Sequence, residues 1–360
     1  MKADNSVRKP FTLGLVVCAV LLSLASARAE PTTAPPPSVD HHMHIFSPEA
    51  SRILNIICAR VGPKKCPPEI SKAPSTGAQV VAALDAAGIQ DGVLLSTAYF
   101  FGSPEVADLH LDIARETRDE NRFVVEQARS QCGRLTAFIS VNPLAPNALD
   151  EIDYWAREGG AAGLKLHLGN SGFDFRSPAQ VKRLAAVFRA AARGHLAIVV
   201  HFETRTPDFG AKDVQIFLRD VAPYARTTPV QIAHAAGGGG VDAHSLAALR
   251  AFADAIQRNR AATGNLFFDL AMVPDELSNT ARIQATPQDV ATLKGLMHRI
   301  GLQRFVLGSD WTSGLDLKPY FDDERTSLAL TDAEWTTLAA NQAPYLAHAA
   351  ARASACAAKR

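Results

Sequence analysis

VDHHMHIF, residues 39–46, holds one aspartate and three of the chain's 11 histidines within five consecutive positions, between apolar neighbours. Successive side chains of a β-strand point to opposite faces, so residues two apart share a face. We therefore expect Asp40, His42 and His44 on one face of a strand, and His41 on the other face, towards covering helices. A His-x-His pair at the end of a strand offers two imidazole nitrogens to one metal ion.

Seven further apolar segments follow this strand, and longer stretches of helical periodicity separate them. Several of these helical stretches begin with Pro, Asp or Thr and end at Gly, as helix boundaries prefer. The apolar runs are nearly continuous, which is typical of parallel strands covered on both faces. Eight β-α units over about 320 residues predict a (β/α)8 TIM barrel rather than an open doubly wound sheet. The predicted strands are residues 38–45, 92–97, 135–141, 162–167, 196–201, 230–234, 266–273 and 304–309.

The amino-terminal segment differs in composition from the barrel that follows. Residues 1–29 predict a secretory signal peptide, because basic residues precede an uncharged apolar run and Ala-Arg-Ala then fits cleavage before Glu30. An uncleaved anchor is the alternative. Pro-rich residues 30–37 predict an extended tether, and residues 38–355 a single barrel domain. We therefore expect an exported protein, periplasmic or secreted, that has no membrane association after signal cleavage.

The charge balance and the cysteines indicate which partners and cross-links to expect. The 37 basic residues balance the 36 acidic ones without a basic block, which argues against nucleic acid and favours a small-molecule substrate. Export permits disulfides, and Cys58 and Cys66 form the closest pair, but sequence alone leaves their bridging open. These two cysteines lie in a long Pro-rich connection, residues 46–76, of a length that is usually functional. A monomer and a homo-oligomer both remain open.

Polar residues end several of the predicted strands, at the edge where barrel enzymes place their catalytic groups. Three imidazoles and one carboxylate among them make a ligand set that suits Zn²⁺ or a similar divalent ion and leaves a position for water. A polar barrel rim without metal is the alternative. The strand-end residues are His42 and His44, Lys165 and His167, His201, His234, and Asp310 directly after the last strand.

VDHHMHIF also fits the D-x-H-x-H opening of the amidohydrolase superfamily. With GLKLH, IVVHFE, VQIAHAAGG, FVLGSDW and NQAPYL in family order, residues 38–350 resemble the amidohydrolase-related branch. That branch includes aminocarboxymuconate-semialdehyde decarboxylase, resorcylate decarboxylases and pyrone-dicarboxylate lactonase. The resemblance implies that His42, His44, His201 and Asp310 bind the metal and that Asp310 also accepts a proton from the attacking water. It implies that His234 polarises the substrate or shuttles a proton.

The remaining candidate residues are substrate contacts. The resemblance implies one divalent ion, preferentially Zn²⁺, with Lys165 and His167 facing the substrate; the alternative is a second metal on a carbamylated Lys165. Arg205 suits a substrate carboxylate, or is a solvated loop arginine. Residues 99–101 are aromatic and follow the second strand, where they could wall an apolar pocket. We expect Asp269, inside the seventh strand, to hydrogen-bond within the barrel.

These residues favour a metal-dependent hydrolase that directs a metal-activated water at an ester, lactone or amide bond of a small substrate, which could itself carry a carboxylate. A non-oxidative decarboxylase of an aromatic or unsaturated carboxylate is the first alternative, because the same ligand set would hold a carboxylate and an adjacent oxygen. A non-catalytic exported binding protein on a barrel scaffold is the second.

Overall fold

The computed structural model describes Met1 and residues 34–62, 66, 72–273 and 285–347. Apart from Met1, the predicted signal peptide lies outside these described residues, as do the first part of the tether and the last residues of the predicted barrel domain. The described residues from Ala34 onward form one compact unit. Among the described residues, no helix combines the length and the apolar character that crossing a membrane requires.

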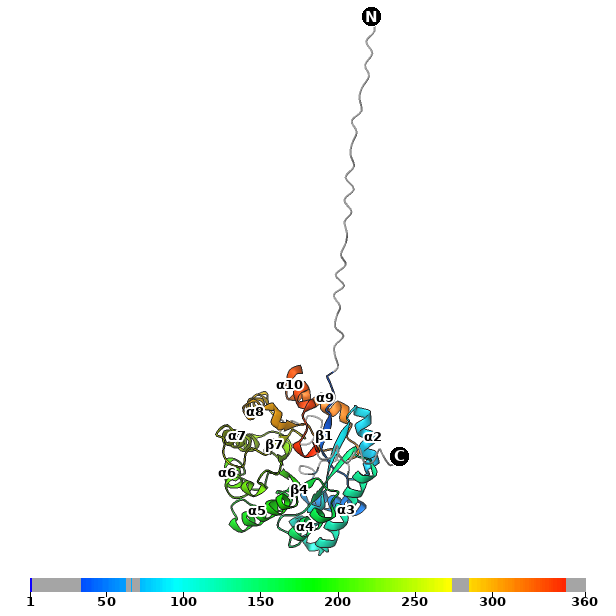
Figure 1. Cartoon of the computed structure of the whole chain (residues 1–360), viewed down its shortest axis with the longest axis vertical. Coiled ribbons are helices and arrows are strands. Elements are labelled where there is room, and N and C mark those ends of the chain that lie inside the picture. The colour runs from blue at the N-terminus through cyan, green and yellow to red at the C-terminus, as the bar shows by residue number, and fades with distance from the viewer. Residues whose placement is uncertain (2–33, 63–65, 67–71, 274–284, 348–360) are drawn as a thin grey trace. The chain divides into compact units, whose positions relative to one another are not determined.

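Eight parallel strands run in chain order, each hydrogen-bonded to the next, with helices around them (Figure 1). The ring closes between the last and first strands, where His41 N donates to Leu307 O at 3.0 Å and His44 N to Trp311 O at 2.8 Å. This confirms the predicted (β/α)8 barrel, and a strand is present in each predicted segment. The strands are β1 Val39–Met43, β2 Asp91–Leu95, β3 Leu135–Ser140, β4 Gly163–His167, β5 Ala197–His201, β6 Val230–Ile232, β7 Leu266–Asp269 and β8 Phe305–Val306.

The helices begin where short polar residues can accept hydrogen bonds from their first N–H groups. Thr76, Thr286 and Thr331 each form a reciprocal capping box with the third residue of the helix that follows. The α-helices are α1 Pro48–Val61, α2 Gly77–Ala87, α3 Ile113–Ser130, α4 Ala148–Glu158, α5 Pro178–Arg193, α6 Ala211–Asp220, α7 Ala243–Gln257, α8 Pro287–Ile300, α9 Leu317–Ser327 and α10 Asp332–Ala340. Short 3-10 turns are η1 Ala98–Gly102, η2 Pro104–Leu109, η3 Ala222–Ala225, η4 Ala233–Ala236, η5 Leu302–Arg304 and η6 Pro344–Leu346.

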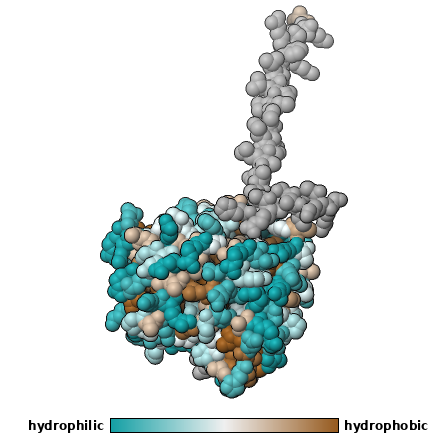
Figure 2. All heavy atoms as spheres, turned by 60° about the horizontal axis from the view of Figure 1, so that its bottom comes forward, coloured by the Kyte–Doolittle hydropathy of each residue, from teal (hydrophilic) through white to brown (hydrophobic). Residues whose placement is uncertain are grey.

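Strand alternation divides the apolar side chains into two layers. In β2, Leu94 packs in the large outer cluster under the helices, while Val93 and Leu95 belong to an inner cluster within the barrel. Ala343 and Tyr345, from the carboxyl-terminal segment, complete this inner cluster. Few large apolar side chains reach the surface, and hydrophilic residues predominate on the face seen in Figure 2.

The first strand departs from simple alternation. Its register against β2 shifts by one residue between Asp40 and Met43, so side chains on either side of the shift do not share a face as expected. Asp40 does not line the pocket with His42 and His44; its carboxylate accepts hydrogen bonds from the backbone of His42 and from Ser309. The His41 ring does not face the helices, since its Nε2 accepts from the N–H of Ala343 in the inner cluster.

Gly163 lies where the inner layer leaves no room for a side chain. A Cβ there would overlap the Phe138 ring and lie 2.5 Å from the carbonyl oxygen of Ala197. We expect Gly163→Ala to lower the free energy of unfolding by about 1–3 kcal/mol through overpacking, measured by urea denaturation. Gly295→Ala on α8 is the control, because nothing lies within 4 Å of its Cβ, and alanine should stabilise a helix by about 0.5–1 kcal/mol. Equal stabilities of the two variants would contradict the packing described.

Candidate metal centre and substrate pocket

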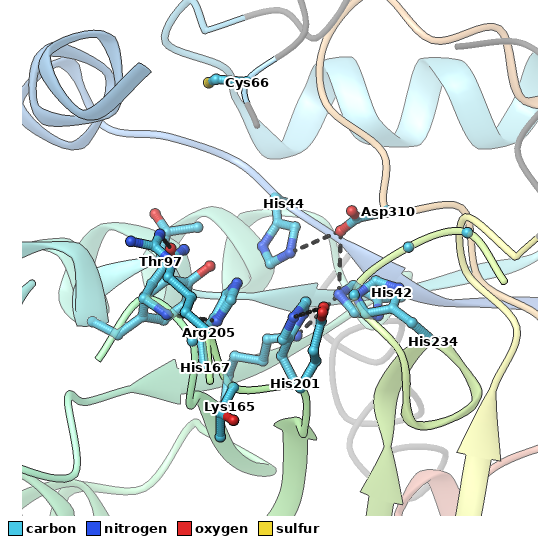
Figure 3. A pocket seen from close by; sticks show the side chains of 18 of the residues that line it. His42, His44, Cys66, Thr97, Lys165, His167, His201, Arg205, His234 and Asp310 are labelled. Carbon is cyan, nitrogen blue, oxygen red and sulfur yellow. Dashed lines mark hydrogen bonds and ion pairs between the residues drawn. The ribbon is translucent and has the colours of Figure 1, made fainter. Parts of the chain in front are cut away.

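A cavity of about 430 Å³ opens at the carboxyl ends of the strands (Figure 3). It brings together side chains from β1, β4, β5 and the segments that follow β5, β6 and β8. All the site residues predicted from the sequence line this one cavity: His42, His44, Lys165, His167, His201, Arg205, His234 and Asp310. The barrel therefore unites groups that lie up to 268 positions apart in the chain, as the strand-end pattern predicted.

The hydrogen-bond partners of His44 and His42 determine which ring nitrogens face the cavity. His44 Nδ1 lies 2.7 Å from Leu95 O, and a carbonyl can only accept, so Nδ1 carries a proton and the neutral form of the ring has its lone pair on Nε2. His42 Nδ1 lies 3.1 Å from Asp269 Oδ2, which likewise places its proton on Nδ1. Burial, reinforced by the charge of Lys165, lowers the pKa of His42 to about 3, so this ring is neutral. Both rings present Nε2 as an acceptor.

Asp310 places its carboxylate beside these two acceptors. Its Oδ1 lies 3.1 Å from His44 Nε2 and 3.3 Å from His42 Nε2. An anionic oxygen and two lone-pair nitrogens this close together require a positive charge beside them, which a metal ion can supply in addition to the Lys165 ammonium near His42. A tetrahedral ion with bonds of about 2.0 Å separates its ligand atoms by about 3.3 Å, which matches the observed spacing. These three residues therefore fit a divalent metal ion.

His201 and His234 lie next to this group. Among the described residues, two sets of potential ligands have all their donor atoms within 4.8 Å of one another: His42, His44 and Asp310, and His42, His234 and Asp269. His201 belongs to neither set, and its ring centroid lies 4.9 Å from that of His234. His234 Nδ1 lies 2.7 Å from Ala271 O, so its proton is on Nδ1 and Nε2 is an acceptor. The predicted fourth ligand, His201, thus lies in the same cavity beside the best-defined group.

The backbone around the site adopts unusual conformations. Asp310 has φ 56°, and the three residues from His234 to Ala236 have φ between 50° and 72°. Non-glycine residues avoid this left-handed region, at a cost of about 1–3 kcal/mol each where the structure enforces it. At His234 the backbone N–H donates to Asp269 Oδ1 at 2.8 Å, which holds the turn. These left-handed residues follow the ends of β6 and β8, and the side chains of His234 and Asp310 line the cavity.

Lys165 is fully buried between the histidines and acids. Its Nζ lies 3.0 Å from His42 Nε2, in the position where it competes with an ion for that lone pair. Burial lowers its pKa to about 8, although Asp310 and Asp269 act in the opposite direction. The placement fits the predicted substrate contact at the floor of the cavity.

The wall opposite the metal candidates is organised around Asn170. Its backbone N–H donates to His167 Nδ1 at 3.2 Å, so the proton of neutral His167 is on Nε2, which acts as a donor. Its side-chain oxygen accepts from Arg205, whose other amino group pairs with Glu105 at 2.6 Å. Tyr99 lies against the His167 ring, with centroids 5.0 Å apart. Arg205 therefore lines the pocket as predicted, but it already holds an acidic partner.

The outer wall of the pocket includes a disulfide. Cys58 and Cys66 are bonded, with Cα atoms 5.1 Å apart, and Cys66 lines the cavity together with Leu54 and Phe46. The sequence left this pairing open. The bond ties the end of α1 to the connection that follows it, next to the substrate space.

Sequence reasoning overlooked several residues of the site. It placed Asp269 inside the barrel but did not identify it as the partner of His42, and it assigned nothing to Gln231, Tyr345 or Asn170. The position of Asp269 within an apolar strand was a signal, because a buried carboxylate requires hydrogen-bond donors.

The glycines Gly238–Gly240 also line the cavity. A Cβ at Gly238 would overlap the Glu203 carboxylate.

Comparisons with known proteins agree with this fold. The sequence matches the amidohydrolase family model over residues 39–334. Similar solved structures include 5-carboxyvanillate decarboxylase from Sphingomonas paucimobilis, which is 12% identical with a TM-score of 0.55 over 89% of this chain and 99% of that chain. A putative 2-pyrone-4,6-dicarboxylic acid hydrolase from Pseudomonas putida is 16% identical, with a TM-score of 0.52 over 88% and 98% of the two chains.

An amidohydrolase from Burkholderia multivorans, solved with bound zinc, is 15% identical, with a TM-score of 0.52 over 89% of this chain and 99% of that chain. Likeness at these identities shows the fold alone. A search of curated protein sequences finds no match.

Removing either strand-end histidine should empty the metal site. We expect purified protein to hold about one divalent ion per chain, and His42→Ala or His44→Ala to hold almost none, because each variant loses a nitrogen ligand. Elemental analysis measures this content. His298→Ala is the matched control, since that half-exposed histidine pairs with Glu334 away from the cavity. Metal content in either variant equal to that of the control would contradict the assignment.

Proposed function

The chain belongs to the amidohydrolase family, and from this we propose that it is a metal-dependent hydrolase acting on an ester, lactone or amide bond of a small substrate. Family membership and fold indicate an enzyme of the amidohydrolase superfamily. The observation that carries the finer assignment is Asp310, which combines ligand-like distances to two imidazoles with 27% exposure of its side chain towards the pocket. Such a carboxylate can hold an ion and also exchange a proton with a bound water.

The proposed cofactor is one divalent ion, with Zn²⁺ preferred for a set of imidazoles and one carboxylate. His42, His44 and Asp310 would hold it, and His201, which lines the same cavity, is the proposed fourth ligand. When bound, the ion would supply Lewis acidity, which would lower the pKa of a bound water and polarise a carbonyl oxygen. We favour one ion over a second ion on a carbamylated Lys165, because Lys165 Nζ lies 3.0 Å from His42 Nε2, within hydrogen-bond distance as a donor.

The side chains around the proposed ion have separate roles in proton transfer and substrate binding. Asp310 accepts the proton of the attacking water. Because its side chain is partly exposed to the pocket, it can then pass that proton to solvent or substrate. His234 presents Nε2 as an acceptor, so it suits the shuttling of a proton to the leaving group better than the polarising of a carbonyl. His167 presents an N–H donor on the opposite wall, where it can bond a substrate oxygen. Lys165 and Arg205 make this wall suitable for a substrate that carries a carboxylate.

A decarboxylase is the second candidate, and the aromatic wall favours it. Tyr99 and Phe100 line the cavity beside two cationic side chains, Lys165 and Arg205. A carboxylated aromatic ring would pack on such a wall with its carboxylate near the cations. The reaction would then break a carbon–carbon bond, release CO₂ and return a proton to the ring carbon.

We also propose that the chain is exported, with cleavage before Glu30. The disulfide between Cys58 and Cys66 supports this, since such bonds persist in oxidising compartments and are rare in the cytosol. Amino-terminal sequencing of the mature protein checks the cleavage site. A mature protein that begins at Met1 would contradict it.

Chelation should abolish activity, and added Zn²⁺ or Mn²⁺ should restore it. We expect Asp310→Asn to lower kcat/KM by about 1,000-fold or more, because the change removes a charged ligand and the proton acceptor together. The rate of acid release from a panel of lactones and esters measures kcat/KM. Asp322→Asn is the control, because that exposed residue of α9 pairs only modestly with Lys318 on the surface.

The same preparations distinguish the candidates. Release of CO₂ from carboxylated phenols, without acid release from lactones, would replace the hydrolase assignment by the decarboxylase. Ligand binding that survives both chelation and His42→Ala, with no turnover of either panel, would instead indicate a binding protein.

A further inference from the structure

A chain of buried hydrogen bonds runs from the carboxyl-terminal segment to the candidate ligand His42. Tyr345 Oη donates to Gln231 Oε1 at 2.9 Å. Gln231 Nε2 donates to Asp269 Oδ2 at 2.6 Å, and His42 Nδ1 donates to the same oxygen at 3.1 Å. Tyr345 is 5% exposed and the other three residues are inaccessible to solvent, so these bonds are shielded from bulk water.

The direction of each bond is fixed by its neighbour. An ionised carboxylate only accepts, so Gln231 must turn its amide NH₂ towards Asp269 and its oxygen away. The Tyr345 hydroxyl meets that oxygen and supplies the donor it needs. If the amide turned over, its oxygen would face the Asp269 carboxylate without a proton between them. The hydroxyl therefore stabilises the one orientation of Gln231 that supports Asp269.

Asp269 is held on both of its oxygens. Oδ1 accepts from the backbone N–H groups of His234 at 2.8 Å and Ala271 at 3.3 Å, while Oδ2 receives Gln231 and His42. A carboxylate with every direction occupied cannot rotate away from His42. Its bond to Nδ1 keeps the His42 proton on that nitrogen and leaves the Nε2 lone pair towards the cavity.

We propose that Tyr345 and Gln231 are positioning residues for the metal site, acting through Asp269 on the tautomer and orientation of His42. This inference rests on the proposed metal-dependent function. Neither residue touches the substrate cavity, and Tyr345 lies beyond residues 39–334, which match the family model. Tyr345 also packs its ring against Phe138, with centroids 4.9 Å apart, so packing and positioning must be separated by experiment.

Tyr345→Phe separates them, because it removes the hydroxyl and keeps the ring. We expect its Zn²⁺ dissociation constant, measured on metal-free protein by competition with a chromogenic chelator, to rise about 3–10-fold. Asp269→Asn, one bond closer, should raise it about 10–100-fold. The double variant should bind no more weakly than Asp269→Asn alone, because both changes act on the same bond. Gln231→Leu provides a second test of the same chain.

Tyr320→Phe is the matched control, since it removes another buried hydroxyl, which bonds the backbone of Met272 and Gly308. Unfolding temperatures of the metal-free proteins report any purely structural effect. The inference is overturned, with the proposed function intact, if Tyr345→Phe binds Zn²⁺ within about twofold of the Tyr320→Phe control, or if its effect adds fully to that of Asp269→Asn. Wild-type protein that binds no ion overturns the proposed function itself and this inference with it.

Discussion

The hydrogen bond between His42 Nδ1 and Asp269 is the interaction on which the candidate site depends. It decides that Nε2 of His42 is an acceptor, and it ties β1 to β7 within the barrel. Burial acts to raise the pKa of Asp269, but the interactions with His42 and His234 outweigh it and hold the pKa below its usual range. A buried charge is tolerated only when it is paired and hydrogen-bonded. The Asp269 carboxylate of β7 meets this condition through its bonds to His42 of β1 and Gln231 of β6.

The polar site is assembled at the expense of regular secondary structure. β6 ends at Ile232 and β8 at Val306, and left-handed residues follow each of them. In β1 the register shift places His42 and His44 towards the cavity while Asp40 supports Ser309, directly before Asp310. The apolar layers described above stabilise the barrel enough to hold these strained turns, which is the usual relation between a scaffold and its functional site.

The fold was largely predictable because its signal is local. Each strand is largely an apolar run, and several end in or are followed by a polar residue that the barrel topology carries to one edge, so His42, Lys165, His201 and Asp310 could be placed together from sequence. The register shift in β1 could not be foreseen, since it depends on pairing with β2 and leaves no mark in the alternation of VDHHMHIF. Gln231 and Tyr345 escaped notice because their bond spans 114 positions and neither residue type alone indicates a site.

The contacts of the carboxyl-terminal segment have a kinetic consequence. Ala343 bonds to His41 across 302 positions of the chain, and the first strand pairs with residues beyond the last one. Contacts of such long range form late, because their loop-closure entropy is met only once most of the chain is ordered. We therefore expect the pairing of β1 with this segment to be one of the later steps of folding, so that the histidines of β1 reach their final positions late.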